Sequence, residues 1–408
     1  MSKLAIKGGE PIRDTPFPQW PVFDKREVEA LREVVYSRFW GIGGKKVKEF
    51  EEKFAAYQGA KYGVAVTSGT TALETTLRAA NIKAGDEVVM PAYTFSATAA
   101  AVLQVNALPV FADIDPSTYT LDPRRVEETI TDKTKAIIPV HIGGCPANMV
   151  SIIRIANRSN LMTIEDACQS WGAEWKGRRV GAIGNLGAFS FQSSKNITSG
   201  EGGIITTNDK ELCELCWSYH NCGRTLEGPQ YEHELLGFNY RMTEFQAAVL
   251  LVQLSRLDEQ TKTRNENASY LSKELSKIGG VEPLQQCEEV TRHAYHLYIF
   301  KYNNEEFSDL PRSRFLEALR AEGIPCSPGY TPLHRHRSML KLAQDPLLSQ
   351  LYGKKVDYST VELPVTERAC NEESVWFYQN MLLGTREDMD DIVDAIAKIK
   401  ENAEELMS

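Results

Sequence analysis

One lysine of this chain lies in surroundings that are unusual for its residue type. Lys195 stands in the stretch FQSSKNITSGEGG, residues 191–203, among small polar residues, with a strand-like run before it and glycines after it. A lysine normally lies on a solvated surface beside other charges. This placement indicates an amine that the chain delivers into a site, and a lone lysine of a surface loop is the alternative.

The stretch TSGTTALE, which follows the apolar run YGVAV, could bind an anion. Ser68, Gly69 and Thr70 form a turn of small residues that opens a helical pattern. Backbone N–H groups at the start of a helix, with hydroxyls beside them, suit a phosphate group. Ordinary capping of the helix by a serine or threonine would explain the same residues.

An acid, an aromatic residue and a hydroxyl occupy similar places after other apolar runs. Asp166 ends LMTIED, Tyr93 follows DEVVM in PAYTF, and Ser190 lies just inside the end of LGAFSF. A carboxylate at a buried strand end needs a cation or hydrogen-bond donors. Tyr93 could lie over a planar ligand. A structural ion pair for Asp166 and core packing for Tyr93 are the alternatives.

The order of the apolar runs predicts a fold that would gather these residues. From residue 61 onward, short apolar runs alternate with helical patterns, which is typical of an α/β fold with a mostly parallel sheet and helices on both faces. Ligands of such sheets bind beyond the carboxyl ends of the strands. A phosphate cradle, an acid, an aromatic face and an amine together suit pyridoxal 5'-phosphate, whose aldehyde needs an amine and whose ring nitrogen needs a carboxylate.

We expect three regions along the chain. Residues 1–23 form an N-terminal extension, residues 24–278 a large cofactor-binding domain that ends in a long connecting helix, and residues 279–408 a smaller α+β domain. Two helices are expected within 24–58, and a long helix or a helical pair within 244–278. The glycines at 279 and 280 mark the last boundary.

The composition excludes several classes of protein. A net charge of −9 and the absence of a basic block argue against a nucleic-acid partner. No apolar stretch approaches the length of a membrane span, and the first residues lack the apolar core of a signal peptide. Eight cysteines without an obvious framework indicate reduced thiols. We therefore expect a soluble, cytoplasmic protein.

A zinc site is an alternative use of the stretch CELCWSYHNC. Its ligands would be Cys213, Cys216, His220 and Cys222. The same stretch has helical periodicity, and structural zinc ligands usually flank turns rather than lie within one helix. Helix packing is therefore favoured, and we expect no metal.

Five stretches resemble, in order, the motifs of the DegT/StrS-type pyridoxal phosphate aminotransferases, which act on nucleotide-linked keto-sugars and keto-cyclitols. They are TSGTTAL, PAYTFSATA, EDACQSWGA, GAFSFQSSKNITSGEGG and GFNYRMTEFQAAVL. The resemblance runs from about Trp20 to the C-terminus and is strongest between Gly63 and Leu257. It implies a type I fold similar to aspartate aminotransferase, and a homodimer with shared active sites at the subunit interface.

The resemblance also implies roles for single residues at the cofactor ring. Lys195 would hold the cofactor as a Schiff base, and Asp166 would pair with the pyridinium nitrogen. Gln169 would lie near the phenolic oxygen, and Tyr93 would stack on the ring. With a lysine rather than a histidine at position 195, the sequence departs from the related sugar dehydratases.

The phosphate group has its own expected partners. By resemblance, Gly69, Thr70 and Ser190 would hold it, and Asn239 would reach the phosphate of the neighbouring subunit's cofactor. No arginine stands out as a partner for the carboxylate of an amino donor. Arg241 and the basic loop 334–337 are the two possibilities.

The expected reaction is the transfer of an amino group from glutamine or glutamate to a keto-cyclitol or keto-sugar. The stretch FSFQSSK resembles the branch that contains scyllo-inosose aminotransferases and 3-amino-5-hydroxybenzoate synthase. A nucleotide-linked keto-sugar as acceptor, dehydratase or aromatizing chemistry on the same fold, and a non-catalytic regulator are the alternatives.

Overall fold

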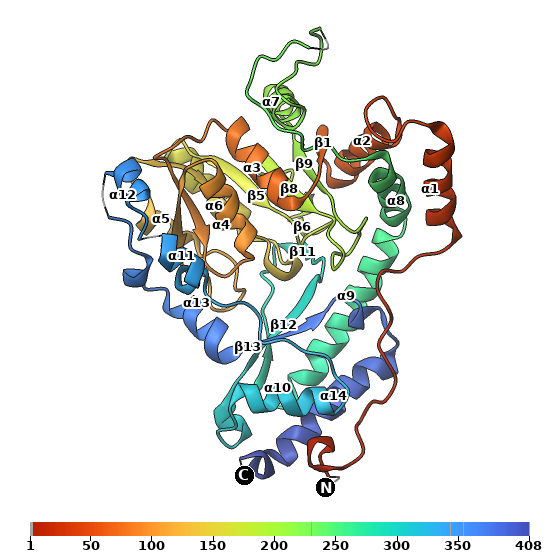
Figure 1. The fold of residues 1–408 in the computed structure, drawn as a ribbon. Helices are drawn as coiled ribbons and strands as arrows, with labels where there is room; N and C mark the ends of the chain where they lie inside the picture. The colour runs from red at the N-terminus through yellow and green to blue at the C-terminus, as the bar shows by residue number, and fades with distance from the viewer. Residues whose placement is uncertain (1–2, 230, 343, 354, 408) are drawn as a thin grey trace.

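The computed structural model describes residues 3–229, 231–342, 344–353 and 355–407 (Figure 1). It begins with an extended segment and two helices, α1 (Lys25–Ser37) and α2 (Lys46–Gln58), which confirm the pair predicted within residues 24–58. Asp24 caps α1 in a capping box with Glu27. Gly59 ends α2 in the left-handed conformation, with φ of 71°.

A seven-stranded sheet forms the centre of the larger part of the molecule. Its order is β1-β9-β8-β5-β4-β2-β3. The strands are β1 (Tyr62–Val66), β2 (Glu87–Pro91), β3 (Leu108–Ala112), β4 (Thr134–Ile137), β5 (Met162–Asp166), β8 (Leu186–Ser190) and β9 (Gly203–Thr207). Only β9 runs antiparallel to its neighbours in this sheet, β1 and β8. The predicted mostly parallel sheet is therefore confirmed.

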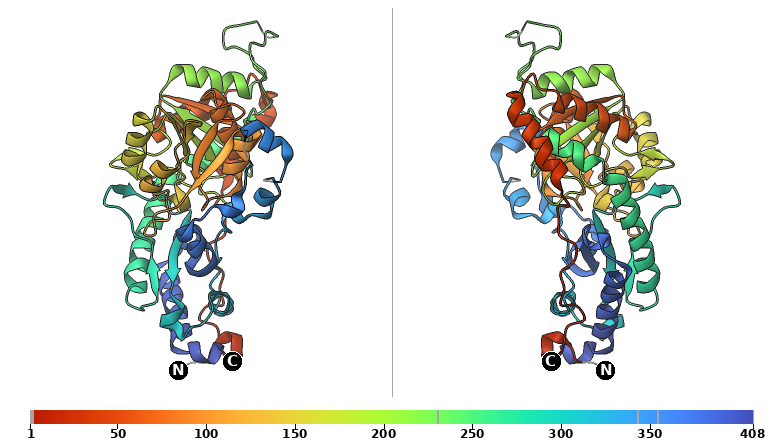
Figure 2. Two further views of the ribbon diagram at one scale, coloured as in Figure 1. Left: turned by 90° about the vertical axis from the view of Figure 1, so that its left-hand side faces the viewer. Right: turned by 90° about the vertical axis from the view of Figure 1, so that its right-hand side faces the viewer.

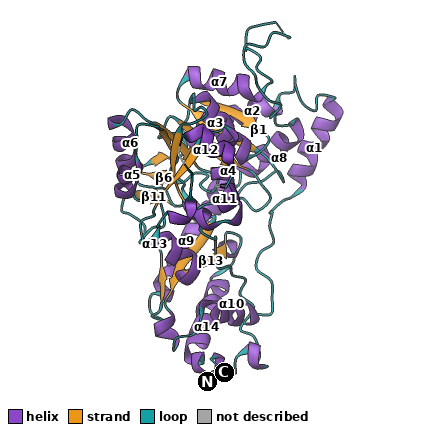
Figure 3. Ribbon diagram, turned by 60° about the vertical axis from the view of Figure 1, so that its left-hand side comes forward, coloured by secondary structure: helices purple, strands orange, loops and turns teal. Residues whose placement is uncertain are grey.

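Helices cover both faces of this sheet (Figure 3). They are α3 (Gly69–Ala79), α4 (Ser96–Gln104), α5 (Pro123–Thr129), α6 (Met149–Arg158), α7 (Lys210–His220) and α8 (Glu244–Leu254). Side chains alternate along a strand. Val88 and Met90 of β2 accordingly pack in the core that contains residues of α3 and α4, whereas Val89 packs in the core that contains residues of α5 and α6.

A smaller α+β part follows the long connecting segment. Its sheet contains β10 (Val281–Pro283), β12 (Leu297–Tyr302) and β13 (Ser374–Tyr378), and its helices are α9 (Leu257–Leu275), α10 (Arg312–Ala321) and α14 (Arg386–Glu401). The segment 244–278 forms the helical pair α8 and α9 rather than one unbroken helix. Short elements complete the chain: β6 (Glu174–Trp175), β7 (Arg178–Arg179), β11 (Val290–Arg292), α11 (Arg337–Leu342), α12 (Pro346–Tyr352) and α13 (Pro364–Arg368).

The hydrophobic cores cross the domain boundary expected at residue 279. The division of the chain into domains at that residue stays a prediction. Leu4 and Phe17 of the N-terminal segment pack in the core of the smaller part, where Figure 1 shows that segment descending beside α14. Met339 of α11 and Tyr352 of α12 pack instead in the core of the large sheet. Figure 2 shows α11 and α12 lying against the larger part. Both crossings remove apolar side chains from water, which stabilises the contact between the two parts.

Among the described residues, no helix has the length and apolar character that crossing a lipid bilayer requires.

Candidate active site

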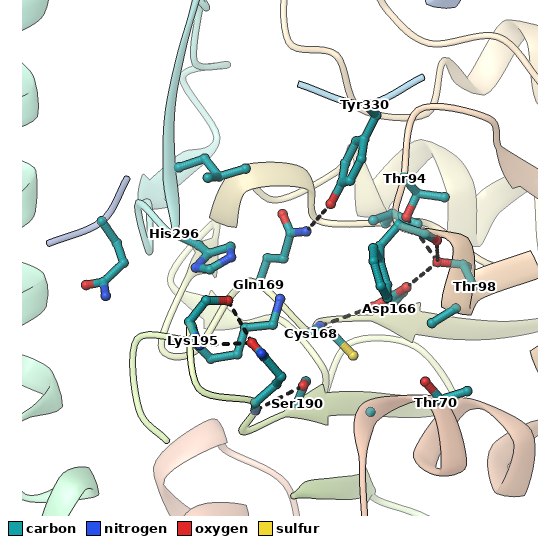
Figure 4. Close-up of a pocket in the computed structure, with 18 of the residues that line it drawn as sticks. Thr70, Thr94, Thr98, Asp166, Cys168, Gln169, Ser190, Lys195, His296 and Tyr330 are labelled. Carbon is teal, nitrogen blue, oxygen red and sulfur yellow. Dashed lines mark hydrogen bonds between the residues drawn. The ribbon is translucent and has the colours of Figure 1, made fainter. Parts of the chain in front are cut away.

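A cavity of about 730 Å³ lies at the carboxyl ends of the central strands, between the large sheet and the smaller part (Figure 4). Such a volume is typical of a site for a small ligand. Seven residues that the sequence singled out line it together: Ser68, Gly69, Thr70, Asp166, Gln169, Ser190 and Lys195. They come from the start of α3, the end of β5, and the end of β8 with the loop that follows it.

Lys195 lies in a tight loop between β8 and β9. Its backbone N–H donates to the carbonyl of Gln192 at 2.9 Å, and the next residue, Asn196, is fully buried and donates from Nδ2 to the carbonyl of Ala294 at 2.8 Å. Burial lowers the pKa of the Lys195 amine, while the nearby Cys168 and Asp166 act against this shift. The loop therefore presents an amine that loses its proton more readily than an ordinary lysine.

Asp166 is the acid of the cavity, and its neighbour Glu165 has a different task. Asp166 is 5% exposed, and its Oδ2 accepts a hydrogen bond from the Thr98 hydroxyl at 2.8 Å while Oδ1 accepts one from the Cys168 N–H at 3.2 Å. Glu165 is fully buried and lies 3.0 Å from Nε2 of His141. It accepts hydrogen bonds from the backbone N–H groups of Gly181, Ile183 and Gly184. Alternation along β5 thus sends one carboxylate to the cavity and the other into the structure.

The start of α3 reaches the cavity because residue 69 is a glycine. A Cβ atom at Gly69 would lie 2.8 Å from Sγ of Cys168 and 2.8 Å from Cβ of Ser190. The Ser68 hydroxyl accepts a hydrogen bond from the Thr71 N–H at 3.2 Å, so the capping alternative also holds for Ser68. The helix start and the end of β8 together form a cradle of backbone and small side chains in which an anion fits.

The prediction for Tyr93 is wrong. Its side chain is fully buried, its hydroxyl lies 2.8 Å from the Ser374 hydroxyl, and it accepts a hydrogen bond from Nε1 of Trp376 at 2.9 Å. Tyr93 does not line the cavity, whereas Phe95 does so with a side chain that is 59% exposed. The motif PAYTF holds both aromatic residues, and only the turn between Pro91 and α4 decides which one faces the ligand.

Gln169 connects the large sheet to the smaller part. Its Oε1 accepts a hydrogen bond from the Gly143 N–H at 2.7 Å, and its Nε2 donates to the hydroxyl of Tyr330 at 2.9 Å. Burial raises the pKa of the Tyr330 phenol, which therefore stays protonated. The sequence analysis did not identify Tyr330 or the other cavity residues of the smaller part. All five motifs lie before residue 279, and these residues come after it.

Three further predictions concern residues outside the cavity lining. Asn239 is exposed, precedes α8 and forms a backbone bridge with Asn221; its predicted contact with a neighbouring subunit stays a prediction. Arg241 donates to Oδ1 of Asn221 at 3.1 Å, and His334 lies 2.8 Å from Oε1 of Glu367. Neither basic residue lines the cavity.

The cysteine stretch forms helix α7, as its periodicity predicts. Cys216 is fully buried and packs in the core of the large sheet, and Nδ1 of His220 lies 2.6 Å from the carbonyl of Trp217. The part of the chain that the structure describes contains no group of three or more His, Cys, Asp or Glu residues that could hold a metal ion.

Comparison with known proteins decides the family. The family model described as the DegT/DnrJ/EryC1/StrS aminotransferase family matches residues 21–397. The chain belongs to this family. The resemblance that the five motifs indicated is therefore confirmed over nearly the whole chain.

Two curated relatives are similar to this aminotransferase along their full length. A protein of Micromonospora echinospora with the provisional name L-glutamine:3-amino-2,3-dideoxy-scyllo-inosose aminotransferase is 41% identical over 410 residues, covering 98% of this chain and 97% of its own. The L-glutamine:2-deoxy-scyllo-inosose aminotransferase of Streptoalloteichus tenebrarius is 38% identical over 420 residues, covering 99% of both chains.

Solved structures agree with the family assignment. 3-Amino-5-hydroxybenzoic acid synthase has a TM-score of 0.84 at 32% identity, over 95% of this chain and 99% of that one. NtdA of Bacillus subtilis, solved with its bound cofactor PMP, has a TM-score of 0.80 at 28% identity, over 95% of this chain and 86% of its own. The fold is thus that of the type I pyridoxal phosphate enzymes.

Pyridoxal 5'-phosphate is the cofactor of these aminotransferases, and the cavity fits it. The cradle at Gly69 suits its phosphate, the Lys195 amine suits its aldehyde, and the hydrogen-bonded Asp166 suits its ring nitrogen. The Thr98 hydroxyl and the Cys168 N–H both donate to Asp166, and these two hydrogen bonds fix the direction of its carboxyl group.

Proposed function

We propose that this aminotransferase moves the amino group of glutamine to the ketone of a cyclitol. The observation on which the proposal rests is the convergence of Lys195, Asp166 and the cradle at Gly69 on one cavity. The two relatives described above, both named as glutamine-dependent inosose aminotransferases, support glutamine as donor and a keto-cyclitol as acceptor.

The side chains of the cavity divide the work of such a reaction. The cofactor supplies an electron sink that makes the Cα–H bond of the donor acidic. Lys195 would hold the aldehyde of the cofactor, and its Nζ, when it is free, would take up the proton of the donor's Cα. Burial, which lowers the pKa of this amine, keeps a larger fraction of it free to accept that proton.

Other residues hold the reacting groups in place. Asp166, fixed by the Thr98 hydroxyl and the Cys168 N–H, would place a carboxylate where a protonated ring nitrogen needs one. Gln169 is fixed from both sides by the Gly143 N–H and the Tyr330 hydroxyl, so it can orient a polar group of the ring without rearranging.

We also propose that two copies of the chain assemble with shared sites. Large apolar side chains are exposed on α1 and the loop after it: Val28, Val35, Tyr36, Phe39, Trp40 and Ile42. An exposed apolar face of this size favours a protein partner. Asn239 is exposed and forms a backbone bridge with Asn221, the residue that follows α7, so a second subunit can reach it. The described part of the chain between these two residues protrudes from the molecule in Figure 1.

The visible absorption of the protein with pyridoxal phosphate, before and after glutamine, tests the first half of the reaction. Two results would support the proposal. The cofactor band of the wild type should change on addition of glutamine. The band should be absent in Lys195→Ala and present in the control variant Lys176→Ala. A band that ignores glutamine and glutamate would contradict it, and so would normal turnover of Lys195→Ala.

The acceptor is identified with the protein that has reacted with glutamine and carries its cofactor as pyridoxamine phosphate. This amine form is isolated and mixed with candidate ketones. We expect 2-deoxy-scyllo-inosose or a related keto-cyclitol to restore the original band and to yield an aminocyclitol. Restoration by a nucleotide-linked keto-sugar alone would favour the second class of acceptor instead. An aromatic product would indicate the aromatizing chemistry named for 3-amino-5-hydroxybenzoic acid synthase.

A further inference from the structure

A fully buried arginine without an acidic partner lies behind the wall of the cavity. Arg264 of α9 is 0% exposed, and no salt bridge joins it to any described acid. Its hydrogen bonds go to one residue, because Nε donates to the carbonyl of Gln379 at 3.3 Å and Nη2 donates to Oε1 of the same side chain. Its Nη1 has no hydrogen-bond partner among the described residues. Buried arginines are normally paired, so this one needs an explanation.

The guanidinium group stays positively charged in this position. Burial lowers the pKa of Arg264 to about 9, which still leaves it protonated near neutral pH. Its guanidinium carbon lies 5.6 Å from the ring centroid of Trp20, which lines the cavity, as do Gln379 and His296. Burial, with the charges of Lys195 and Arg264, holds the pKa of His296 far below its usual range, so His296 is neutral there.

The positive charge is therefore uncompensated at this end of the cavity. Asp166 and Glu201 are the acids that line it. Asp166 is occupied by Thr98 and the Cys168 N–H, and Glu201 is exposed in the loop before β9. Neither has an ion pair with Arg264 in the described structure. A negatively charged part of a ligand would gain most from binding near Trp20 and Gln379.

The arginine also fixes the direction of the Gln379 amide. A guanidinium group only donates hydrogen bonds, so the oxygen of the amide must face Arg264 and the nitrogen must face away. Gln379 is 3% exposed and lines the cavity. The Nε2 atom of Gln379 has no hydrogen-bond partner among the described residues. Unlike Nη1 of Arg264, this atom is not fully buried. The side chain thus presents two polarised N–H donors to the cavity.

We propose that Gln379, held by Arg264, binds the α-carboxylate of the amino donor. This assignment rests on the proposed function. An amino acid that places its amine at Lys195 necessarily brings a carboxylate, one bond away from the reacting carbon, into the same cavity, whereas a cyclitol ketone brings no charge. Gln379 is the binding residue, and Arg264 is a positioning residue that polarises the amide and supplies long-range attraction.

The proposal is tested on the holoenzyme with two donors that differ only at this group. L-Glutamine is compared with L-glutamine α-amide, in which an uncharged carboxamide replaces the carboxylate, by the rate at which each converts the cofactor band. We expect wild type to prefer the carboxylate by roughly 10- to 100-fold in kcat/KM, the range of a hydrogen bond to a charged group. Gln379→Met, which keeps the volume and removes both donors, should lose most of that preference through a higher KM.

Charge inversion and a matched control sharpen the test. Gln379→Glu would place a carboxylate beside the donor's own and should favour the α-amide over glutamine. Gln104→Met makes the same chemical change as Gln379→Met at an exposed position at the far end of α4, and should leave the preference unchanged. The reaction of the pyridoxamine form with the ketone should proceed in Gln104→Met at the wild-type rate, because Gln104 lies outside the cavity.

A non-reacting probe measures binding separately. Glutaramate, which is glutamine without its amino group, should bind wild type and Gln104→Met alike in a calorimetric titration, and Gln379→Met and Arg264→Lys roughly 10-fold or more weakly. If wild type and Gln379→Met had the same preference for glutamine over the α-amide, the proposal would be overturned. The aminotransferase function would remain intact in that case. A wild type that glutamine fails to convert would instead refute the proposed function.

Discussion

At the scale of one side chain, two hydrogen bonds hold the carboxyl group of Asp166 in place at the edge of the sheet. Asp166→Asn would keep the size and remove the charge that supports a protonated ring nitrogen. We expect the variant to retain the cofactor but to convert with glutamine roughly 100-fold more slowly or worse. Stopped-flow absorption measures this rate. An unchanged rate in a correctly folded variant would remove Asp166 from its assigned role.

The two aromatic residues of PAYTF should separate in their effects. Phe95→Ala removes an exposed ring from the cavity wall, and we expect cofactor affinity to fall about 2- to 10-fold, as for a lost aromatic stack. Tyr93→Phe removes a hydroxyl that lies buried between Ser374 and Trp376. It should lower the free energy of unfolding by about 1–3 kcal/mol and leave cofactor affinity unchanged. Cofactor titrations measure the affinity, and denaturant unfolding of both variants measures the stability. If cofactor affinity fell only in Tyr93→Phe, Tyr93 rather than Phe95 would be the aromatic residue that contacts the cofactor.

At the scale of elements, the close approach of α3 to β8 depends on Gly69. Gly69→Ala would bring a methyl group within 2.8 Å of Cys168 and Ser190, so the helix start must move away from the cavity. We expect a loss of about 1–3 kcal/mol in the free energy of unfolding, together with weaker binding of pyridoxal phosphate. Gly41→Ala is the control, since a Cβ there meets nothing within 4 Å. Equal behaviour of the two variants would show that the contact is unimportant.

A carboxyl between α2 and the edge strand β1 predicts how stability depends on pH. Oε1 of Glu51 accepts a hydrogen bond from the Ala65 N–H at 2.8 Å, and burial raises the pKa of Glu51 from 4.5 to about 7. A raised folded pKa gives stability that is fully present below about pH 4.5 and is lost as the pH rises through 7. Glu51→Gln keeps the acceptor and removes the titration.

The measurement is unfolding by denaturant at several pH values. Between pH 5 and pH 8 the free energy of unfolding of the wild type should fall by about 2 kcal/mol more than that of Glu51→Gln. Identical pH dependence of the two proteins would contradict the assigned pKa of Glu51.

Sequence patterns predicted the elements of the large sheet because its strands are short apolar runs bounded by helical patterns. They could not decide between Tyr93 and Phe95, since both follow β2 within one turn and the choice depends on packing against Trp376. Nor could they find Tyr330, Gln379 or Arg264, whose functions arise only when the smaller part folds against the sheet.

At the scale of the whole molecule, the proposed dimer with shared sites predicts that two inactive variants can complement each other. In a mixed dimer of Lys195→Ala and Asn239→Ala, one site would combine the intact Lys195 of one subunit with the intact Asn239 of the other. Co-expression in equal amounts should restore about a quarter of wild-type turnover, because half of the dimers are mixed and half of their sites are complete. Turnover no higher than that of the separate variants would show that Asn239 does not serve a partner's site.

The N-terminal segment also has a consequence for the order in which the protein can be completed during synthesis. Arg13 forms ion pairs with Asp388 and Asp391 of α14, and the N–H of Ala5 donates to Glu322 just after α10. Residues 5 and 13 therefore cannot dock until residues 322, 388 and 391 have been made, and contacts of such long sequence separation form late. Trp20, which lines the cavity from the same segment, takes its place only then. The active site would thus close only after α14 has been made.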